Sequence, residues 1–599
     1  MFVARRTFFL SSALIAATAG IRSLGFAQTP SRGDEFRRQY GALNFRDDIE
    51  ALRFLKEAQD FGTIPPADIA SYGAYLDNLP LMRLIKTDQG PELYHLIQWH
   101  AFSLDMTALD HTTVQPGLNV PPDLFYAEQF GPHRASRALA IVHLAIFEAV
   151  NAIYRQARSY KDVQSKIFAE TGFMPDNITP NTASVKAAMA AAAYITLVSL
   201  YPHKTAFTQA IFDKLTASNP DNPHAQQLGN AIGASAARQI LLLRKYNFDT
   251  LQFADGCQSD GMGGIKPLGP NDNSLSLEPQ FSDLYVSPSA QQWQVDPIHP
   301  TNMTALGGYW SSVDTFVLHP GQLFLPPGPP AQDSDKFQIA YAAVRSLGGD
   351  PNPVPIGARY PTKTTRTGTA PGAPLDDSNE TFKGIFWGYD ATNLLCAPPR
   401  LYNMIATSTA LDEFPIRDVS EMARYLALIN ITLADAAIAA WTAKYKFNYA
   451  RPVTYIRQTQ PDQVVNGTKN QQWTPLGAPI TNGAPEGANT TPPFPAYPSG
   501  HAVFGGALFT AMRRLLPLPS NTDTAFKFVS DEYNGVNRGP TGDLRPYVQR
   551  SFASFEAAEA ENAQSRIWLG IHWQFDADDG RDQGHKVARY VVDHALKRI

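Results

Sequence analysis

The sequence predicts an all-α protein with two helical halves that a long, Pro- and Gly-rich loop region joins. Many segments carry apolar residues at three- and four-residue spacing, which is typical of helices that bury one face. Between residues 251 and 377 the composition changes, and Pro, Gly, Ser and Asp, which favour turns and loops, become dominant. With 599 residues and 44% hydrophobic residues, the chain is long and apolar enough for two or three units with their own cores.

The first half is predicted to form an N-terminal helical bundle over residues 35–250. The helical spacing recurs in 48–86, 134–154, 184–201, 204–217 and 225–245. The longest uncharged apolar run, 187–201, is shorter than the roughly 18 residues that a membrane span needs. We therefore expect a buried helix there, and no integral membrane segment in the mature chain.

The loop-rich connecting region covers residues 251–380, with one predicted helix over 335–346. A connection this long in a compact protein usually wraps a surface or shapes a pocket entrance, although a partly disordered linker is the alternative. The two cysteines of the chain are Cys257, in this region, and Cys396. Two cysteines are too few for a zinc site, and their positions do not decide whether they pair.

The second half, residues 381–599, is predicted to be the catalytic bundle. Its expected helices cover 418–444, 501–516, 525–535, 552–568 and 583–597. These helices matter because every chemical motif described below lies on them or beside them.

Charge and the N-terminus restrict partners and location. The 50 Lys and Arg residues against 55 Asp and Glu give a net charge of −5, and no basic run indicates nucleic-acid binding. Arg5-Arg6 precedes an apolar stretch of small residues, which predicts a twin-arginine-type signal over 1–27 and export to the periplasm or medium. A Sec signal or an unstructured terminus is the alternative.

Three short motifs of the second half suit the binding of a tetrahedral oxyanion. Arginine forks and a lysine neutralise its charge, a helix start adds N–H donors, and two histidines can bond the central atom and move a proton. In chain order, the motifs are Lys444 with Arg451-Pro452, then Pro498-Ser499-Gly500-His501, then Ser565-Arg566 with Gly570, His572 and Asp576.

The local sequence predicts how these motifs fold. A helix ends near Lys444 and a turn brings Arg451 back, because the residue before a proline avoids helical geometry. Ser499 starts a helix, with a simple N-cap as the alternative role. Gly570 breaks the chain so that His572 turns inward. Taken alone, the cations would be solvated charges at helix ends. The other eleven histidines are expected to be structural.

The motifs resemble those of the superfamily shared by vanadium-dependent haloperoxidases and type 2 phosphatidic acid phosphatases. Over about 380–599 the chain is similar to the fungal-type vanadium chloroperoxidases. The 63 residues between His501 and Ser565 favour haloperoxidases over compact acid phosphatases. The segments that carry the similarity are 387–390, 397–400, 492–497, 534–538 and 571–577, with Trp441.

The resemblance implies two four-helix-type bundles, a vanadate (V5+) cofactor, and hydrogen peroxide, halide and a small organic acceptor as partners. His572 would bind vanadium. The residues expected to hold the vanadate oxygens are Lys444, Arg451, Ser499, Gly500 and Arg566. The residues expected to act in catalysis are His501 as acid–base, Lys444 on the bound peroxide, Asp390 as support for Arg566, and Asp576 as support for an imidazole or an arginine.

Two aromatic residues are candidates for the side of the pocket that receives the halide. Phe494 stands where the chloroperoxidases carry an aromatic residue and bromoperoxidases a histidine, so Phe494 and Trp441 are candidates for the halide wall, with core packing as the alternative.

The expected activity is halide oxidation by hydrogen peroxide. A secreted acid phosphatase would use His572 as nucleophile and His501 as leaving-group acid. A helical binding protein with a relic site is a third class, which the full motif set disfavours. The preferred halide and the oligomeric state stay open.

Overall fold

The structure, a computed structural model, describes much of residues 90–599. The residues between 90 and 599 that it leaves out are 112–127, 130, 218, 249–251, 254–257, 260–264, 267–289, 295, 299–305, 309, 350–379, 391–394, 415, 417, 466–467, 478–490, 519–522 and 535–546. The predicted signal (1–27), the helical segment 48–86 and Cys257 therefore lie outside the described residues. Cys396 is a buried free thiol whose Sγ lies 3.4 Å from His111 Nδ1.

The N-terminal half is helical, as predicted. All four predicted helices that can be compared are present, with ends within two residues of the expected ones. The helices are α5 (Gly90–Asp110), α6 (Pro132–Tyr154), α7 (Val163–Thr171), α8 (Val185–Leu200), α9 (Thr205–Thr216) and α10 (Pro223–Leu243). Short 3-10 turns are η3 (Tyr160–Asp162), η4 (Pro175–Asn177) and η5 (Pro202–Lys204).

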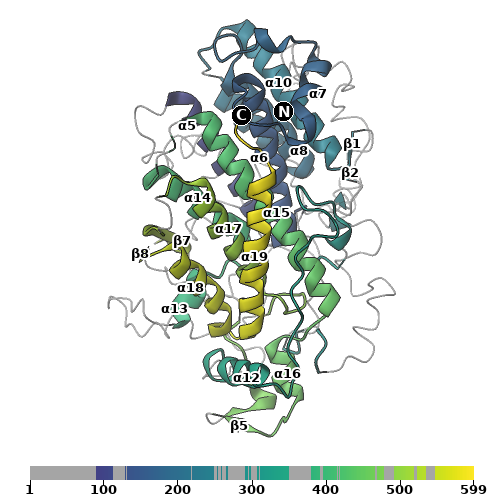
Figure 1. Cartoon of the computed structure of the whole chain (residues 1–599), viewed down its shortest axis with the longest axis vertical. Coiled ribbons are helices and arrows are strands. Elements are labelled where there is room, and N and C mark those ends of the chain that lie inside the picture. The colour runs from purple at the N-terminus through teal and green to yellow at the C-terminus, as the bar shows by residue number, and fades with distance from the viewer. Residues whose placement is uncertain are drawn as a thin grey trace, which may run out of the picture.

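The rest of the chain adds the helices that carry the motifs. They are α12 (Asp335–Leu347), α13 (Glu380–Phe386), α14 (Pro398–Asp412), α15 (Val419–Phe447), α16 (Pro452–Gln458), α17 (Gly500–Leu515), α18 (Phe555–Trp568) and α19 (Gln574–His594). Two 3-10 turns are η6 (Trp310–Ser312) and η8 (Asn470–Gln472). Helices α15, α17 and α19 run side by side through the second half (Figure 1).

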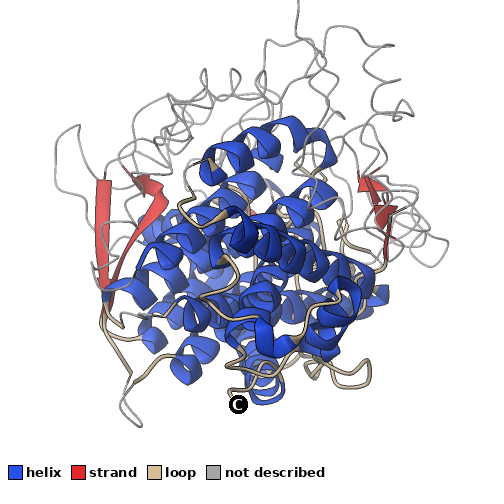
Figure 2. Cartoon of the chain, turned by 90° about the horizontal axis from the view of Figure 1, so that it is seen from above, coloured by secondary structure: helices blue, strands red, loops and turns tan. Residues whose placement is uncertain are grey.

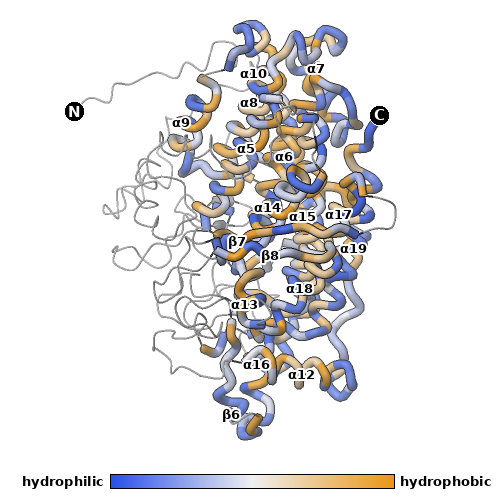
Figure 3. The backbone as a smooth tube through the Cα atoms, turned by 90° about the vertical axis from the view of Figure 1, so that its left-hand side faces the viewer, coloured by the Kyte–Doolittle hydropathy of each residue, from blue (hydrophilic) through white to orange (hydrophobic). Residues whose placement is uncertain are grey.

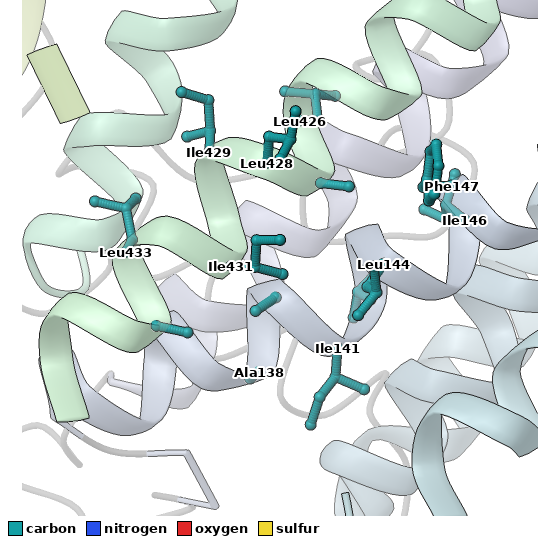
Figure 4. Packing of buried hydrophobic residues seen from close by; sticks show 14 of the residues in the cluster. Ala138, Ile141, Leu144, Ile146, Phe147, Leu426, Leu428, Ile429, Ile431 and Leu433 are labelled. Atoms are coloured by element: carbon teal, nitrogen blue, oxygen red, sulfur yellow. The ribbon is translucent and has the colours of Figure 1, made fainter. Parts of the chain in front are cut away.

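The two halves share one apolar core, because α15 of the second half packs along α6 of the first. Leucine, isoleucine and alanine side chains of both helices meet there (Figure 4), including Ile141, Leu144 and Ile431. By length and composition, α6 and α15 would both pass for membrane spans. However, the apolar window is 100% buried in α6 and 94% buried in α15, as in core helices. Alanine-rich α8 is also buried, as predicted.

The helix predicted over 525–535 is wrong, because Phe526–Asn534 forms strand β7. It pairs antiparallel with β8 (Tyr547–Phe552), and the Phe526 and Phe528 side chains are buried on one face. The apolar residues at every second position, Phe526 and Phe528, have the two-residue period of a strand and not the spacing of a helix. The other described strands are β1 (Tyr246–Asn247), β2 (Gln252–Phe253), β3 (Gln258–Ser259), β4 (Ile265–Lys266), β5 (Val464–Val465) and β6 (Thr468–Lys469). Figure 2 shows the strands at the edge of a mass of helices.

Three predicted helices need new bounds. Helix α18 begins at Phe555 rather than at 552, because Phe552 belongs to β8. The other two changes lie beside the candidate site. The last helix was expected over 583–597, but α19 begins at Gln574, since Asp576 at the third helical position bonds to the backbone N–H of Trp573. Helix α15 continues past Lys444 to Phe447 and ends where Asn448 takes φ 46°. As a result, Asp576 lies in the first turn of α19 and Lys444 lies in the last turn of α15.

A buried histidine pair ties α5, α6 and α14 together. His143 Nδ1 faces the Leu139 carbonyl at 2.7 Å and must donate, so His143 Nε2 accepts from His100 Nδ1 at 2.9 Å. His100 Nε2 in turn accepts from the Thr407 hydroxyl at 2.8 Å. Each ring is therefore neutral in the fold, and burial lowers the pKa of His143 to about 4.

This pair predicts a loss of stability in acid. Unfolding frees His143 to protonate near its ordinary pKa, so the unfolded chain binds more protons as pH falls from about 6.5 to about 4. We expect His143 to remove about 3 kcal/mol of unfolding free energy over that window, and none of this loss above it. Urea unfolding at pH 7 and pH 4 measures the change. The His143→Gln variant should lose less over the same window, and identical pH slopes for the two proteins would contradict the prediction.

Candidate active site

Lys444 lies fully buried in the last turn of α15. Its ammonium donates to the carbonyl oxygens of Pro495 and Ala496, at 2.9 and 3.0 Å, and of Pro498, at 2.5 Å. These bonds hold the serine motif against the helix end. Burial, followed by the charge of Arg451, lowers the pKa of Lys444. An anion in this pocket would favour the charged form again.

Arg451 returns to the same place, as the sequence predicts. It has extended backbone (φ −67°, ψ 151°) directly before α16. Its guanidinium donates from Nε to the Phe494 carbonyl at 3.0 Å and from Nη1 to the Ile571 carbonyl at 2.9 Å. Nη1 also lies 2.9 Å from His572 Nε2, whereas buried Nη2 has no hydrogen-bond partner. Arg451 thus links the segment before the serine motif to the third motif.

Ser499 precedes α17, but its side chain does not cap that helix. The hydroxyl is buried and has no hydrogen-bond partner, so the simple N-cap role is not what the structure contains. A Cβ at Gly500 would sit 3.7 Å from the Trp441 ring and 4.0 Å from Lys444 Cε, which is ordinary contact distance. The backbone at Gly500 therefore faces space next to the Lys444 side chain.

Arg566 arrives on the last turn of α18, as predicted. Its Nη2 donates to Asp390 Oδ1 at 2.5 Å, which confirms the expected pairing. Its Nε and Nη1 are buried without a partner. Gly570 then turns the chain with φ 72°, and a Cβ there would lie 2.2 Å from the Gly348 carbonyl oxygen, so only glycine fits.

His572 follows the turn and is almost completely buried. Its Nδ1 lies 2.8 Å from Asp576 Oδ2, which confirms Asp576 as the group that orients the imidazole. Because the carboxylate accepts from Nδ1–H, the lone pair is on Nε2, beside Arg451. Burial and the nearby cations lower the pKa of His572, so the ring is neutral, and the Nε2 lone pair accepts from Arg451 Nη1 at 2.9 Å in the absence of a bound group.

His501 begins the first turn of α17 and points at a different chain segment. Its Nε2 lies 2.8 Å from the Gly388 carbonyl oxygen and 3.0 Å from that of Trp387. Nε2 must therefore carry the proton, which leaves Nδ1 as an acceptor. Burial and then the charge of Arg566 lower the pKa of His501 to about 3, so without a bound anion the ring is a neutral base.

The unsatisfied donors of the pocket decide what it fits. Arg451 Nη2, Ser499 Oγ, and Arg566 Nε and Nη1 are buried hydrogen-bond donors from three distant chain segments, and none has a protein partner. An unsatisfied buried donor costs roughly 1–3 kcal/mol, more if charged, and oxyanion oxygens would satisfy it. Among the residues that the structure describes, no His, Cys, Asp and Glu group could hold a metal cation. The donor set thus fits an oxyanion such as vanadate, held next to His572 Nε2.

Trp441 and Phe494 lie against these cations. Their ring centroids are 4.9 Å apart, and Lys444 Nζ lies 5.1 Å from the Phe494 centroid. The sequence did not reveal that His133 stacks on Trp441 at 4.9 Å, with both ring nitrogens buried and without a hydrogen-bond partner. It also did not reveal the carbonyl acceptors of His501, since backbone groups leave no residue signature.

Comparison with known proteins agrees with this geometry. A family model described as the VCPO second helical-bundle domain matches residues 424–599. A vanadium chloroperoxidase of Curvularia inaequalis is 37% identical over 233 residues, a match that covers 34% of this chain. The chain spans only 37% of the length of that relative.

Solved structures extend the likeness to the fold of both halves. A bacterial vanadium-dependent iodoperoxidase has a TM-score of 0.53 at 21% identity, covering 84% of this chain and 97% of its own. A bacterial vanadium-dependent chloroperoxidase in its apo form has a TM-score of 0.51 at 17% identity, covering 81% and 99%. At these identities the likeness establishes the fold, which is the all-α, two-bundle architecture expected from the sequence.

Proposed function

Since the chain resembles the vanadium-dependent haloperoxidases, we propose that it binds vanadate and oxidises halide with hydrogen peroxide to hypohalous acid. The balanced reaction consumes hydrogen peroxide, halide and one proton, and releases hypohalous acid and water. The observation that carries the proposal is the set of unpaired donors on Arg451, Ser499 and Arg566, next to the neutral Nε2 of His572. Bound vanadate would supply a Lewis-acidic V5+ centre that activates peroxide without changing oxidation state.

The protein residues have separate tasks in this proposal. His572 donates the Nε2 lone pair, which Asp576 orients, while Lys444 and the two arginines neutralise the oxyanion. His501 Nδ1 takes a proton from hydrogen peroxide as it binds and returns it when water forms. The Nε2–H bonds to the backbone keep that ring in one tautomer throughout.

One comparison tests the reaction class. Purified protein is assayed for peroxide-dependent bromination of a dye, with and without added orthovanadate, and for phosphatase turnover without vanadate. The proposal expects bromination that depends on vanadate and saturates near one vanadium per chain. Strong phosphatase turnover with no vanadate-dependent bromination would overturn it.

Phe494 leads to a prediction about the halide. An apolar ring beside Lys444 and Arg451 excludes water from the cationic wall, which favours oxidation of chloride, the harder halide to oxidise. We expect measurable chloride oxidation at mildly acidic pH and faster bromide oxidation. Phe494→His should lower the ratio of chloride to bromide kcat/KM by roughly 10-fold, equivalent to about 1.4 kcal/mol of barrier.

The halide comparison requires equal vanadium content in both proteins, because weaker loading would lower both rates together. Phe447→His is the matched control, since the Phe447 ring packs on Tyr497 and lies beside Lys446 rather than Lys444 or Arg451. If the fully loaded wild-type protein oxidises bromide but never chloride across the acid range, the chloroperoxidase assignment is wrong. The vanadate site would survive that result.

A further inference from the structure

Two functional side chains depend on one short segment, residues 386–390, which follows α13. The backbone oxygens of Trp387 and Gly388 bond to His501, and Asp390 bonds to Arg566. The segment thus orients a residue of α17 and a residue of α18 at once. Its Tyr389 has φ 44°, a conformation that non-glycine residues hold only where surrounding contacts impose it.

Strand β7 provides those contacts from three consecutive residues. The Ser530 hydroxyl donates to the Phe386 carbonyl at 2.7 Å, and the Asp531 N–H donates to the Tyr389 hydroxyl at 2.7 Å. Glu532 Oε1 accepts from the Tyr389 N–H at 3.2 Å. Ser530 and Glu532 are fully buried, so water does not compete for these bonds.

The shape of β7 explains why these groups point at the segment. Val529 pairs with Gln549 and Asn534 with Tyr547, so four β7 residues, 530–533, stand opposite one residue of β8. This irregularity takes Ser530 and Glu532 out of the regular ladder, and bulges beside active sites commonly re-aim side chains in this way. The hairpin itself lies on the outside of the bundle, next to α13 and α18 (Figure 3).

The same strand is anchored to the first half of the chain. Asp531 Oδ2 lies 3.3 Å from Arg400 Nε, and Arg400 Nη1 lies 3.0 Å from Asp105 Oδ1 on α5. All three side chains are buried. The position of β7 is therefore set by contacts outside the oxyanion pocket.

We propose that Ser530 and Glu532 are positioning residues, which hold segment 386–390 so that His501 and Arg566 face the oxyanion correctly. Ser530 acts through the Phe386 carbonyl, and Glu532 acts through the Tyr389 N–H. The inference rests on the proposed function, because it concerns the affinity and turnover of that same site.

The test measures orthovanadate and inorganic phosphate affinity by calorimetry on vanadate-free protein, and then kcat and KM for hydrogen peroxide. Ser530→Ala and Glu532→Leu should each weaken orthovanadate binding by roughly 10–100-fold, as loss of outer-shell partners does. They should lower kcat more than they raise KM. Glu532→Gln retains an acceptor oxygen for the Tyr389 N–H and should restore affinity to within a few-fold of wild type. If Glu532→Leu does not fold, Tyr389→Phe loosens the same segment by another contact, because it deletes the hydroxyl that accepts from the Asp531 N–H, and it should also weaken orthovanadate binding.

Asp523→Ala is the matched control at the other end of the hairpin. Asp523 accepts from the N–H groups of Phe555 and Glu556 at the start of α18, so its loss should lower the Tm and leave affinity unchanged. Wild-type affinity in Ser530→Ala and Glu532→Leu would overturn the inference. The inference would also be overturned if Glu532→Gln or Asp523→Ala lost as much orthovanadate affinity as Glu532→Leu. Neither of these two variants removes the acceptor of the Tyr389 N–H. Failure of the wild-type protein to bind orthovanadate or phosphate would instead overturn the proposed function.

Discussion

Replacing His572 with alanine is expected to abolish vanadate retention and haloperoxidase activity together. The neutral Nε2, in a ring that Asp576 orients by a 2.8 Å contact to Nδ1, is the group that the proposal assigns to the vanadium bond. The effect should exceed the roughly 10–100-fold loss that follows removal of an outer-shell partner. Vanadium analysis after dialysis and dye-bromination kinetics measure the two losses.

His594→Ala serves as the matched control for this variant. His594 is an exposed histidine at the far end of α19, the helix that begins just after His572, and its Nδ1 lies 2.7 Å from the Tyr590 carbonyl oxygen. That variant should retain both vanadium and turnover. Stoichiometric vanadium with full activity in His572→Ala would remove His572 from the ligand role.

Replacing His501 with alanine is expected to leave vanadate bound but reduce turnover by roughly 10²–10⁴-fold, the usual contribution of a positioned acid–base group. Binding should persist because the His501 backbone stays anchored without its ring. Its carbonyl accepts from the Tyr402 hydroxyl at 3.0 Å and from Asn562 Nδ2 at 2.9 Å. The measurement is kcat per bound vanadium, alongside vanadium content.

A loss of vanadium in His501→Ala would show that the ligand and acid–base roles of His572 and His501 have been assigned the wrong way round. In that case His501→Ala would lose vanadium, while the sites that remain loaded turned over normally. The wild-type protein and His594→Ala, prepared in the same buffer, provide the reference for both quantities.

Local residue patterns were enough to predict most of the site. The helical period placed α6, α8, α15 and α17 within a few residues. Pro452 and Gly570 made the turns at Arg451 and His572 predictable, because proline and glycine restrict or free the backbone whatever surrounds them. The pairing of Asp390 with Arg566 follows from the resemblance, and the structure contains it. Asp576 was expected to orient either an imidazole or an arginine, and in the structure it bonds to His572.

Other features depend on contacts between residues far apart in the chain. The strand Phe526–Asn534 depends on β8 as its pairing partner and on the aromatic rings around Phe386, which give its phenylalanine side chains a buried face. Ser499 does not take the alternative role of a simple N-cap, because its buried hydroxyl makes no hydrogen bond to the helix. The tautomer of His501 depends on backbone oxygens of residues 387 and 388, which carry no residue-specific signal in a sequence. Residue type and spacing therefore set which groups reach the site, whereas packing between distant segments set their protonation and direction.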